Sequence, residues 1–390
     1  MSSFSLFLPP FVSAIAIFLS SFFVKHHRNN LQMMRILTLL SFALVLGFGL
    51  TGLLVSNGLN QNGEIIDYSH YYGFYISCVT FIPLLMGMHW SFLSFQLSNA
   101  ADINFIEKTR FGHICIFGPL VSVLASPIAG LVANSLFANY RGYLFMFLVA
   151  SPLLLLEFAF SFAFKPYDSA LFHDDEAEDV PLKDIFSNKM YLFYLAIVAI
   201  LIPSIWASDS IASSYWSSLE STSGNAFNSL AYGFYLALSS LLEFLIIFFN
   251  TKVGFGKNSV LSINLALLFL FIGAISFGII SYFYRVPMEN GLSLAIGIIF
   301  LHSFKGIANG LYCTSNLAIV NHLLGPKARR KAVFLAPCLF QLINSFLQLG
   351  YPLLGEERYL AFFFIALLLF FALLGSFFLD GPLLHWKNKD

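Results

Sequence analysis

Charged residues are scarce in this sequence, and their scarcity excludes an ordinary water-soluble domain. Only 10% of the 390 residues are charged, whereas about a quarter is usual in soluble proteins. Hydrophobic residues make up 58%, and 47 residues are Phe. One water-soluble core cannot hide so many apolar side chains, because surface-to-volume scaling limits its size. The composition therefore predicts that lipid solvates the excess, since Phe inserts favourably into hydrocarbon.

Other absences exclude further classes of function. The net charge is +0, which gives no indication of a nucleic-acid partner, because such partners require a basic face. The apolar segments contain no HExxH motif, no pair of Asp residues and no Ser–His arrangement of the kind that an intramembrane enzyme needs, so we expect neither an enzyme nor a bound cofactor or metal. The cysteines lie far apart in apolar segments, without metal-ligand or disulfide spacing; they are Cys78, Cys115, Cys313 and Cys338.

Long apolar segments dominate what is present. A membrane-spanning helix needs about 20 mostly apolar residues, and eleven segments meet this requirement. They are 8–24, 33–56, 71–97, 113–137, 142–164, 190–209, 228–250, 259–283, 291–320, 330–353 and 357–379. The sequence therefore predicts an all-α, multi-pass membrane protein with about 11 transmembrane helices.

The positions of Lys and Arg support this map. When the connections are assigned alternately to the two sides, sixteen cations fall on one side and only Arg141, Arg285 and Arg358 on the other. The positive-inside rule places the larger set in the cytoplasm. We therefore expect the N-terminus outside and the C-terminus in the cytoplasm.

The longest inner connection, 165–189, is acidic and suggests a solvated linker. Five predicted helices precede it and six follow. This predicts an N-terminal bundle over 1–164 and a C-terminal bundle over 190–390, as in a six-plus-six protein that lacks its first helix.

Four stretches of sequence carry a resemblance to a known family. They are Phe111–Gly118, Glu243–Lys257, Leu301–Lys305 and Gly325–Lys331. These resemble helix starts, a polar patch and basic loops of the major facilitator superfamily, in its lactose-permease and nucleoside-symporter branch. The resemblance implies a major-facilitator-like bundle of two pseudo-symmetric halves. Cys115 and Lys305 stand where those permeases have a sugar-binding Arg and a proton-coupling carboxylate, so these positions imply neither sugar nor proton.

A second branch of the superfamily also fits. Gly87–Trp90 and Gln341 are similar to positions in channel-regulator relatives that share the fold without being clear transporters. Both branches stay open at this point.

Ionisable residues inside the predicted helices are the first candidates for a site, because each costs about 2.5–3.5 kcal/mol to insert. Glu243 and Lys305 are the sharpest pair, and we expect a buried ion pair that opens or closes during transport. A purely structural pair and no contact at all are the alternatives. Asp209 lies near a predicted helix end, where it can reach water.

Polar stripes supply the other candidates. Residues three or four apart share one face of a helix, and two predicted helices have such a face. One stripe contains His302, Lys305, Asn309, Tyr312 and Asn316, and the other contains Gln341, Asn344 and Gln348. Both are interpreted as lining an aqueous cavity, with helix–helix hydrogen bonding as the alternative.

One further candidate is His89 beside Trp90, which could hold a planar or sugar-like solute. A packed helix contact is the alternative for His89, and it is the favoured role of Glu157.

These features predict a secondary active or facilitative transporter of a small solute, working by alternating access. The expected partners are the solute, a coupling proton or ion, and the lipid bilayer. The alternative is a non-transporting membrane regulator or scaffold with the same fold, which the departures from the family motifs favour.

Overall fold

The structure is a computed structural model of the whole chain. It describes residues 3–20, 27–56, 73, 76–89, 91–92, 116–135, 141–162, 181–223, 229–253, 259–284, 291–350 and 357–379. Every described element is helical. The helices are α1 (Ser3–Ser20), α2 (His27–Ser56), a segment over Ile76–His89, α5 (Phe117–Ser135), α6 (Arg141–Ser161), α7 (Leu182–Ser187), α8 (Lys189–Ser223), α9 (Ser229–Val253), α10 (Ser259–Phe283), α11 (Gly291–Gly350), α12 (Arg358–Ser376) and the 3-10 turn η5 (Phe377–Leu379).

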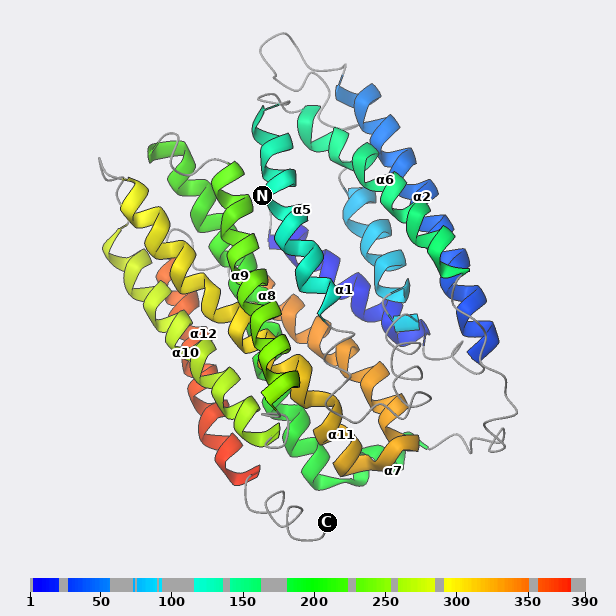
Figure 1. Cartoon of the computed structure of the whole chain (residues 1–390), viewed down its shortest axis with the longest axis vertical. Helices are drawn as coiled ribbons and strands as arrows, with labels where there is room; N and C mark the ends of the chain where they lie inside the picture. Colours follow the sequence, from blue (N-terminus) through cyan, green and yellow to red (C-terminus); the bar gives the residue numbers. More distant parts are fainter. Residues whose placement is uncertain are drawn as a thin grey trace. The chain divides into compact units, whose positions relative to one another are not determined.

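Each of the eleven apolar segments contains described helix (Figure 1). By length and composition, six described helices can cross a membrane, and the described parts of five more are apolar but shorter. The two segments predicted at 291–320 and 330–353 form α11, which bends at Gly325. Gly325 has φ +73°, a left-handed conformation that glycine adopts without steric cost.

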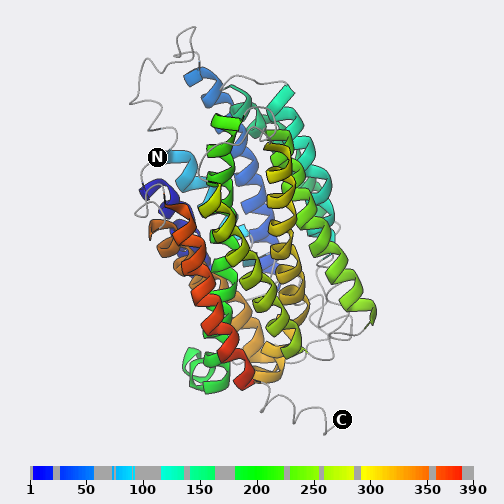
Figure 2. The same ribbon diagram turned by 90° about the vertical axis from the view of Figure 1, so that its left-hand side faces the viewer.

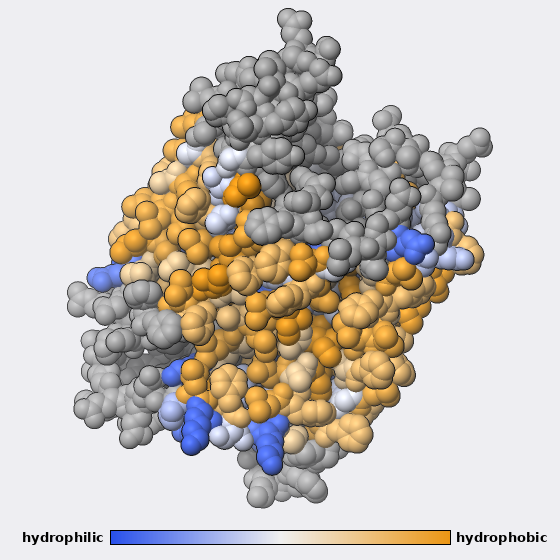
Figure 3. All heavy atoms as spheres, turned by 180° about the vertical axis from the view of Figure 1, so that it is seen from behind, coloured by the Kyte–Doolittle hydropathy of each residue, from blue (hydrophilic) through white to orange (hydrophobic). Residues whose placement is uncertain are grey.

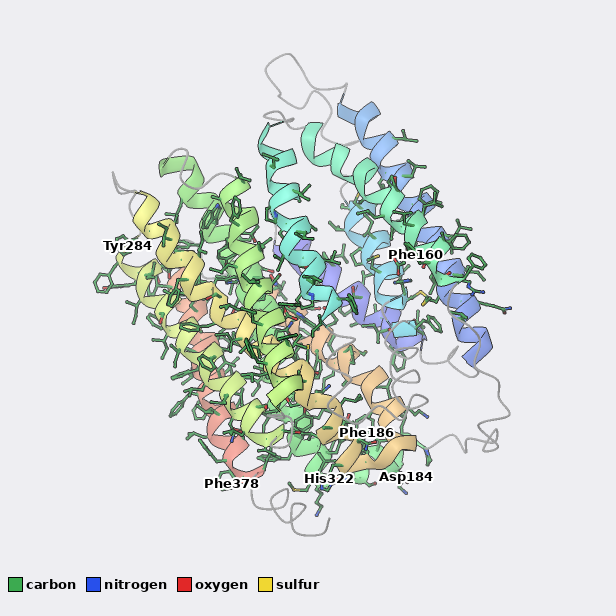
Figure 4. All side chains as sticks on the ribbon, viewed as in Figure 1. Phe160, Asp184, Phe186, Tyr284, His322 and Phe378 are labelled. Atoms are coloured by element: carbon green, nitrogen blue, oxygen red, sulfur yellow. The ribbon has the colours of Figure 1, made fainter. Side chains whose placement is uncertain are left out.

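Large apolar side chains cover the outer surface of these helices. Phe160 and Phe378, labelled in Figure 4, are 68% and 75% exposed. The face shown in Figure 3 is mostly apolar where it is described. A soluble protein would not expose so much contiguous apolar surface, so the chain is an integral, multi-pass membrane protein.

The chain divides into two compact units. Unit 1 comprises Met1–Ala100, Val132–Asp179 and Phe334–Ser345, and unit 2 comprises Ala101–Leu131, Val180–Val333 and Phe346–Asp390. Each unit therefore contains residues from both of the bundles that the sequence predicts, and the division into 1–164 and 190–390 stays a prediction.

In unit 1, α2 packs along α6. Arg35 of α2 donates a 2.9 Å hydrogen bond to the carbonyl oxygen of Ser161, and its guanidinium lies 4.4 Å from the centre of the Phe162 ring. The Arg35 side chain thereby satisfies one of the free carbonyls at the end of α6.

Also in unit 1, α1 contacts two other segments. Ser13 Oγ donates to the carbonyl oxygen of Pro83 at 3.2 Å, and Cys338 Sγ of α11 donates to that of Ala14 at 3.3 Å. Both contacts link segments that are far apart in the sequence.

Unit 2 holds the longer apolar helices. α12 packs against α10 and α8 (Figures 1 and 2), and the rings of Phe277 and Phe362 stack with centroids 4.9 Å apart. A Cβ added at Gly233 of α9 would lie 2.6 Å from the Ser126 carbonyl oxygen of α5. Small residues thus bring helix backbones together, as in other membrane bundles.

Candidate functional site

The candidate site lies in unit 2, where α8 meets the first half of α11. Lys305 Nζ forms an ion pair with Asp209 Oδ2. His302 Nε2 lies 2.9 Å from Asp209 Oδ1, but the ring N–H is not aligned for a hydrogen bond. The contact is therefore mainly electrostatic, and it is an ion pair when the imidazole is protonated. We call Asp209, His302 and Lys305 the charged cluster.

The charged cluster is largely shielded from solvent. The side chains of His302 and Lys305 are 3% and 16% exposed, and that of Asp209 is 31% exposed. The opposite charges of Asp209 and Lys305 balance, which a low-dielectric interior requires. Among the described residues, no three His, Cys, Asp or Glu side chains gather closely enough to hold a metal ion.

The position of Asp209 corrects the sequence interpretation. The predicted helix ended at residue 209, whereas α8 continues to Ser223. Asp209 therefore lies in the middle third of a long helix and not at an end that reaches water.

Glu243 and Lys305 do not form the predicted ion pair. Lys305 pairs with Asp209, and Glu243 Oε1 of α9 accepts a 2.8 Å hydrogen bond from Asn309 Nδ2 of α11. Both candidates lie on helices that contact each other, α9 and α11, but the sequence analysis missed Asp209 as the carboxylate that pairs with Lys305. Glu243 and Lys305 thus contribute to two neighbouring contacts along α11.

Two glycines bring α9 and α11 together beside these contacts. A Cβ added at Gly306 would lie 1.9 Å from the Ser239 carbonyl oxygen, and one at Gly310 would lie 3.0 Å from that of Glu243. The small-xxx-small spacing of Gly306 and Gly310 allows this close approach. This close approach sets the distance between α9 and α11, and therefore which side chains of α9 can contact α11.

Aromatic rings hold the imidazole of His302. The Tyr235 ring of α9 stacks on it with centroids 4.1 Å apart and an interplanar angle of 20°. The Phe277 ring of α10 lies nearly perpendicular to it, with centroids 6.0 Å apart. Tyr235 also contacts Trp216 and Tyr232. This packing fixes the plane of the imidazole next to Asp209.

Residues of both polar stripes on α11 also contact α8 in unit 2. Asn316 Oδ1 accepts a 2.7 Å hydrogen bond from the Tyr194 hydroxyl of α8. Gln348 Nε2 donates to Ser210 Oγ of α8 at 2.6 Å. Tyr312, which precedes Asn316 by four residues, is half-buried. Several of the predicted stripe residues therefore make the helix–helix hydrogen bonds that were the alternative to cavity lining.

The remaining candidates belong to unit 1. His89 is buried, and its Nε2 lies 3.1 Å from Glu157 Oε1 of α6, again without hydrogen-bond alignment. Asn344 is buried and Gln341 is half-buried on the part of α11 in that unit. Trp90 lies outside the described residues. His89 thus makes the helix contact that was the alternative for it, and Glu157 makes the helix contact that was its favoured role.

Sequence reasoning missed Asp209 and Tyr235 as parts of the site. The signal for Asp209 was available, because the sequence after it stays free of charge up to Glu220. A helix carried through that stretch places the carboxylate at membrane depth. Tyr235 carried no comparable signal, because one tyrosine among many aromatic residues is ordinary in such a helix.

The Tyr235 hydroxyl gives a first testable prediction. It is buried and has no hydrogen-bond partner among the described residues, so Tyr235→Phe should keep the stacked ring and leave stability unchanged or raise it by about 1 kcal/mol. Tyr215 is the control, because its buried hydroxyl donates to the Tyr284 carbonyl oxygen at 3.2 Å. Tyr215→Phe should cost about 1 kcal/mol. Thermal unfolding in detergent compares the two, and an equal loss in both would contradict the assignment.

Known proteins with a similar structure show which fold the chain has. No protein-family model and no curated protein matches the chain. Among solved structures, the chain is similar to the proton:xylose symporter XylE bound to 6-bromo-6-deoxy-D-glucose, with a TM-score of 0.66 and 13% identity over 95% of this chain and 84% of that one. It is also similar to the xylose transporter XylE from E. coli in a partially occluded inward-open conformation, with a TM-score of 0.62 and 14% identity over 95% and 86% of the two chains. A D-xylose-proton symporter matches with a TM-score of 0.65 and 14% identity over 97% and 86%.

The chain therefore has the major-facilitator fold, as the sequence predicted. The first match is described as a structure of the major facilitator superfamily, and the matches cover nearly the whole chain. They do not distinguish the two branches suggested by the sequence, so the branch stays a prediction. At this level of identity the likeness concerns the fold, and the residues of the charged cluster must be interpreted from their own contacts.

Proposed function

We propose that the chain is a secondary active or facilitative transporter that moves a small solute by alternating access. The charged cluster is the observation that supports this proposal. Its three ionisable side chains lie inside long apolar helices, where each costs about 2.5–3.5 kcal/mol to insert. Apolar residues would hold the helices together at no such cost. In membrane bundles such groups mark solute and ion pathways.

The proposal extends to a coupling ion. The similar structures are described as proton symporters, and we propose a proton for this chain. Asp209 and His302 can each gain or lose a proton. A proton gained or lost by either side chain alters the charge that faces Lys305. In this proposal the first half of α11 responds to that change.

The proposed mechanism also keeps the predicted topology. The bundles over 1–164 and 190–390 alternate between an inward-open and an outward-open state, with the N-terminus outside and the C-terminus in the cytoplasm. The solute shifts the protein toward whichever of the inward-open and outward-open states binds it more tightly. The size of the shift depends on the difference between the two affinities.

Solute uptake by proteoliposomes tests the proposal. The purified protein should accumulate or equilibrate at least one member of a panel of radiolabelled sugars, polyols and nucleosides, with and without an inward proton gradient. Asp209→Asn should reduce uptake to the level of empty vesicles, because Lys305 then lacks its counter-charge. Asp184→Asn is the matched control, since this carboxylate is exposed on α7, and it should transport like the wild type.

A folded wild-type protein that transports nothing in the panel would contradict the proposal. That result would favour the regulator or scaffold, and a channel or receptor that copurifies in fixed stoichiometry would then support it.

A further inference from the structure

The short helix α7 exposes two apolar side chains on one face. Leu182 and Phe186 are 41% and 46% exposed, and their spacing of four places them side by side. Ile185, on the adjoining face, is 1% exposed. The helix therefore packs one part of its apolar face on the bundle and leaves the neighbouring part open. Figure 4 labels Phe186 together with the exposed Asp184 of the same helix.

Asn188 holds α7 at the end of unit 2. Its extended backbone, with φ −77° and ψ 100°, separates α7 from α8. Its Nδ2 donates to the carbonyl oxygen of Leu323 at 2.7 Å, and its Oδ1 accepts from the backbone N–H of Tyr191 at 3.0 Å. The apolar segment of α8 that is long enough to cross a membrane begins at Lys189, and α7 ends two residues before it.

Two exposed lysines border α7, within a connection that is acidic over Asp174–Asp179. Lys183 and Lys189 are exposed at the two sides of α7. The contact with Leu323 brings the α7–α8 junction next to the turn at Gly325, after which the sequence has four cations: Lys327, Arg329, Arg330 and Lys331. Asp184 is the one acidic residue of α7. An open apolar pair with a basic border is typical of a helix that lies on an anionic membrane surface.

We propose that α7 is an interfacial helix that binds anionic phospholipid. Leu182 and Phe186 enter the boundary between head groups and acyl chains, and Lys183 and Lys189 contact the negatively charged head groups. Lipid is the occupant because α7 is attached at the level where the span of α8 begins. This inference requires the membrane fold but not transport, so it can fail or succeed independently of the proposed function.

Spin labels on the two faces of α7 test the insertion. In protein with its four cysteines replaced by alanine and reconstituted in phosphatidylcholine and phosphatidylserine, a nitroxide is attached to Phe186→Cys or to Asp184→Cys. The label at position 186 should collide mainly with lipid-soluble oxygen, and the label at 184 mainly with a water-soluble nickel chelate. Equal exposure of both labels to nickel would overturn the proposal. Protection of the label at 186 from both reagents would do so too, because protein would then cover the face.

Lipid titration tests the head-group contact. Phosphatidylserine bound to the protein in neutral detergent is counted by native mass spectrometry, with phosphatidylcholine as the reference. The double variant Lys183→Gln/Lys189→Gln should bind phosphatidylserine about five-fold more weakly for each lysine removed, and the corresponding Lys→Arg double variant should retain binding. Asp184→Asn is the control and should bind at least as tightly as the wild type. Unchanged phosphatidylserine binding by the glutamine variant, with the fold confirmed by thermal unfolding, would overturn the proposal.

Discussion

Asp209→Asn should destabilise the protein by about 3 kcal/mol, because it leaves the Lys305 ammonium without its counter-charge inside the bundle. Loss of one partner from a buried pair typically costs about 3–5 kcal/mol. We expect the lower end because 31% of the Asp209 side chain is exposed. Thermal and denaturant unfolding in detergent measure the loss, with the wild type under the same conditions as reference.

A double-mutant cycle shows whether the pair is the cause. Asp209→Asn with Lys305→Gln should recover most of the lost stability, because no uncompensated charge remains, whereas independent sites would add their losses. Glu243→Gln is the matched control. Its amide oxygen can still accept from Asn309, so it should cost less than about 1.5 kcal/mol and should add to Lys305→Gln within about 0.5 kcal/mol. Stronger coupling of Lys305 to Glu243 than to Asp209 would contradict the structure.

Composition and spacing were sufficient to predict an all-α, multi-pass membrane protein because lipid imposes a simple rule, whereas the major-facilitator fold was implied by the resemblance to that family. Every backbone polar group must be satisfied within the membrane, so long apolar segments become helices. The segments 259–283 and 357–379 match α10 and α12 within a few residues. Boundaries were less certain where a helix continues beyond its apolar stretch, as α8 does past residue 209.

The site was harder to predict because its partners depend on tertiary packing. Spacing alone showed that His302, Lys305 and Asn309 share a face of α11, since a helix fixes their relative directions. It could not show which facing carboxylate lies nearer to Lys305. That choice depends on the rotation of α8 and α9 about their axes and on the close approach at Gly306, which one sequence does not reveal.

Gly306→Ala should destabilise the protein by about 3 kcal/mol or more. The new Cβ would lie 1.9 Å from the Ser239 carbonyl oxygen and 2.8 Å from its carbonyl carbon. Overpacking typically costs about 1–3 kcal/mol when side chains can adjust, but here the obstacle is backbone, so α9 and α11 must separate. The gain of about 1 kcal/mol from the better helix propensity of alanine offsets only part of this cost.

Gly297→Ala on the same helix is the control, since nothing lies within 4 Å of its added Cβ, and it should be neutral or stabilising by up to about 1 kcal/mol.

The separation of α9 from α11 has a second consequence, because Ser239 lies one turn from both Tyr235 and Glu243 on α9. Moving α9 away from Gly306 would pull Tyr235 off the His302 ring and Glu243 off Asn309 together. We therefore expect Gly306→Ala to abolish solute uptake even in the fraction that folds, while Gly297→Ala transports normally. Equal stability and uptake in the two variants would show that the close approach of α9 and α11 does not position the site.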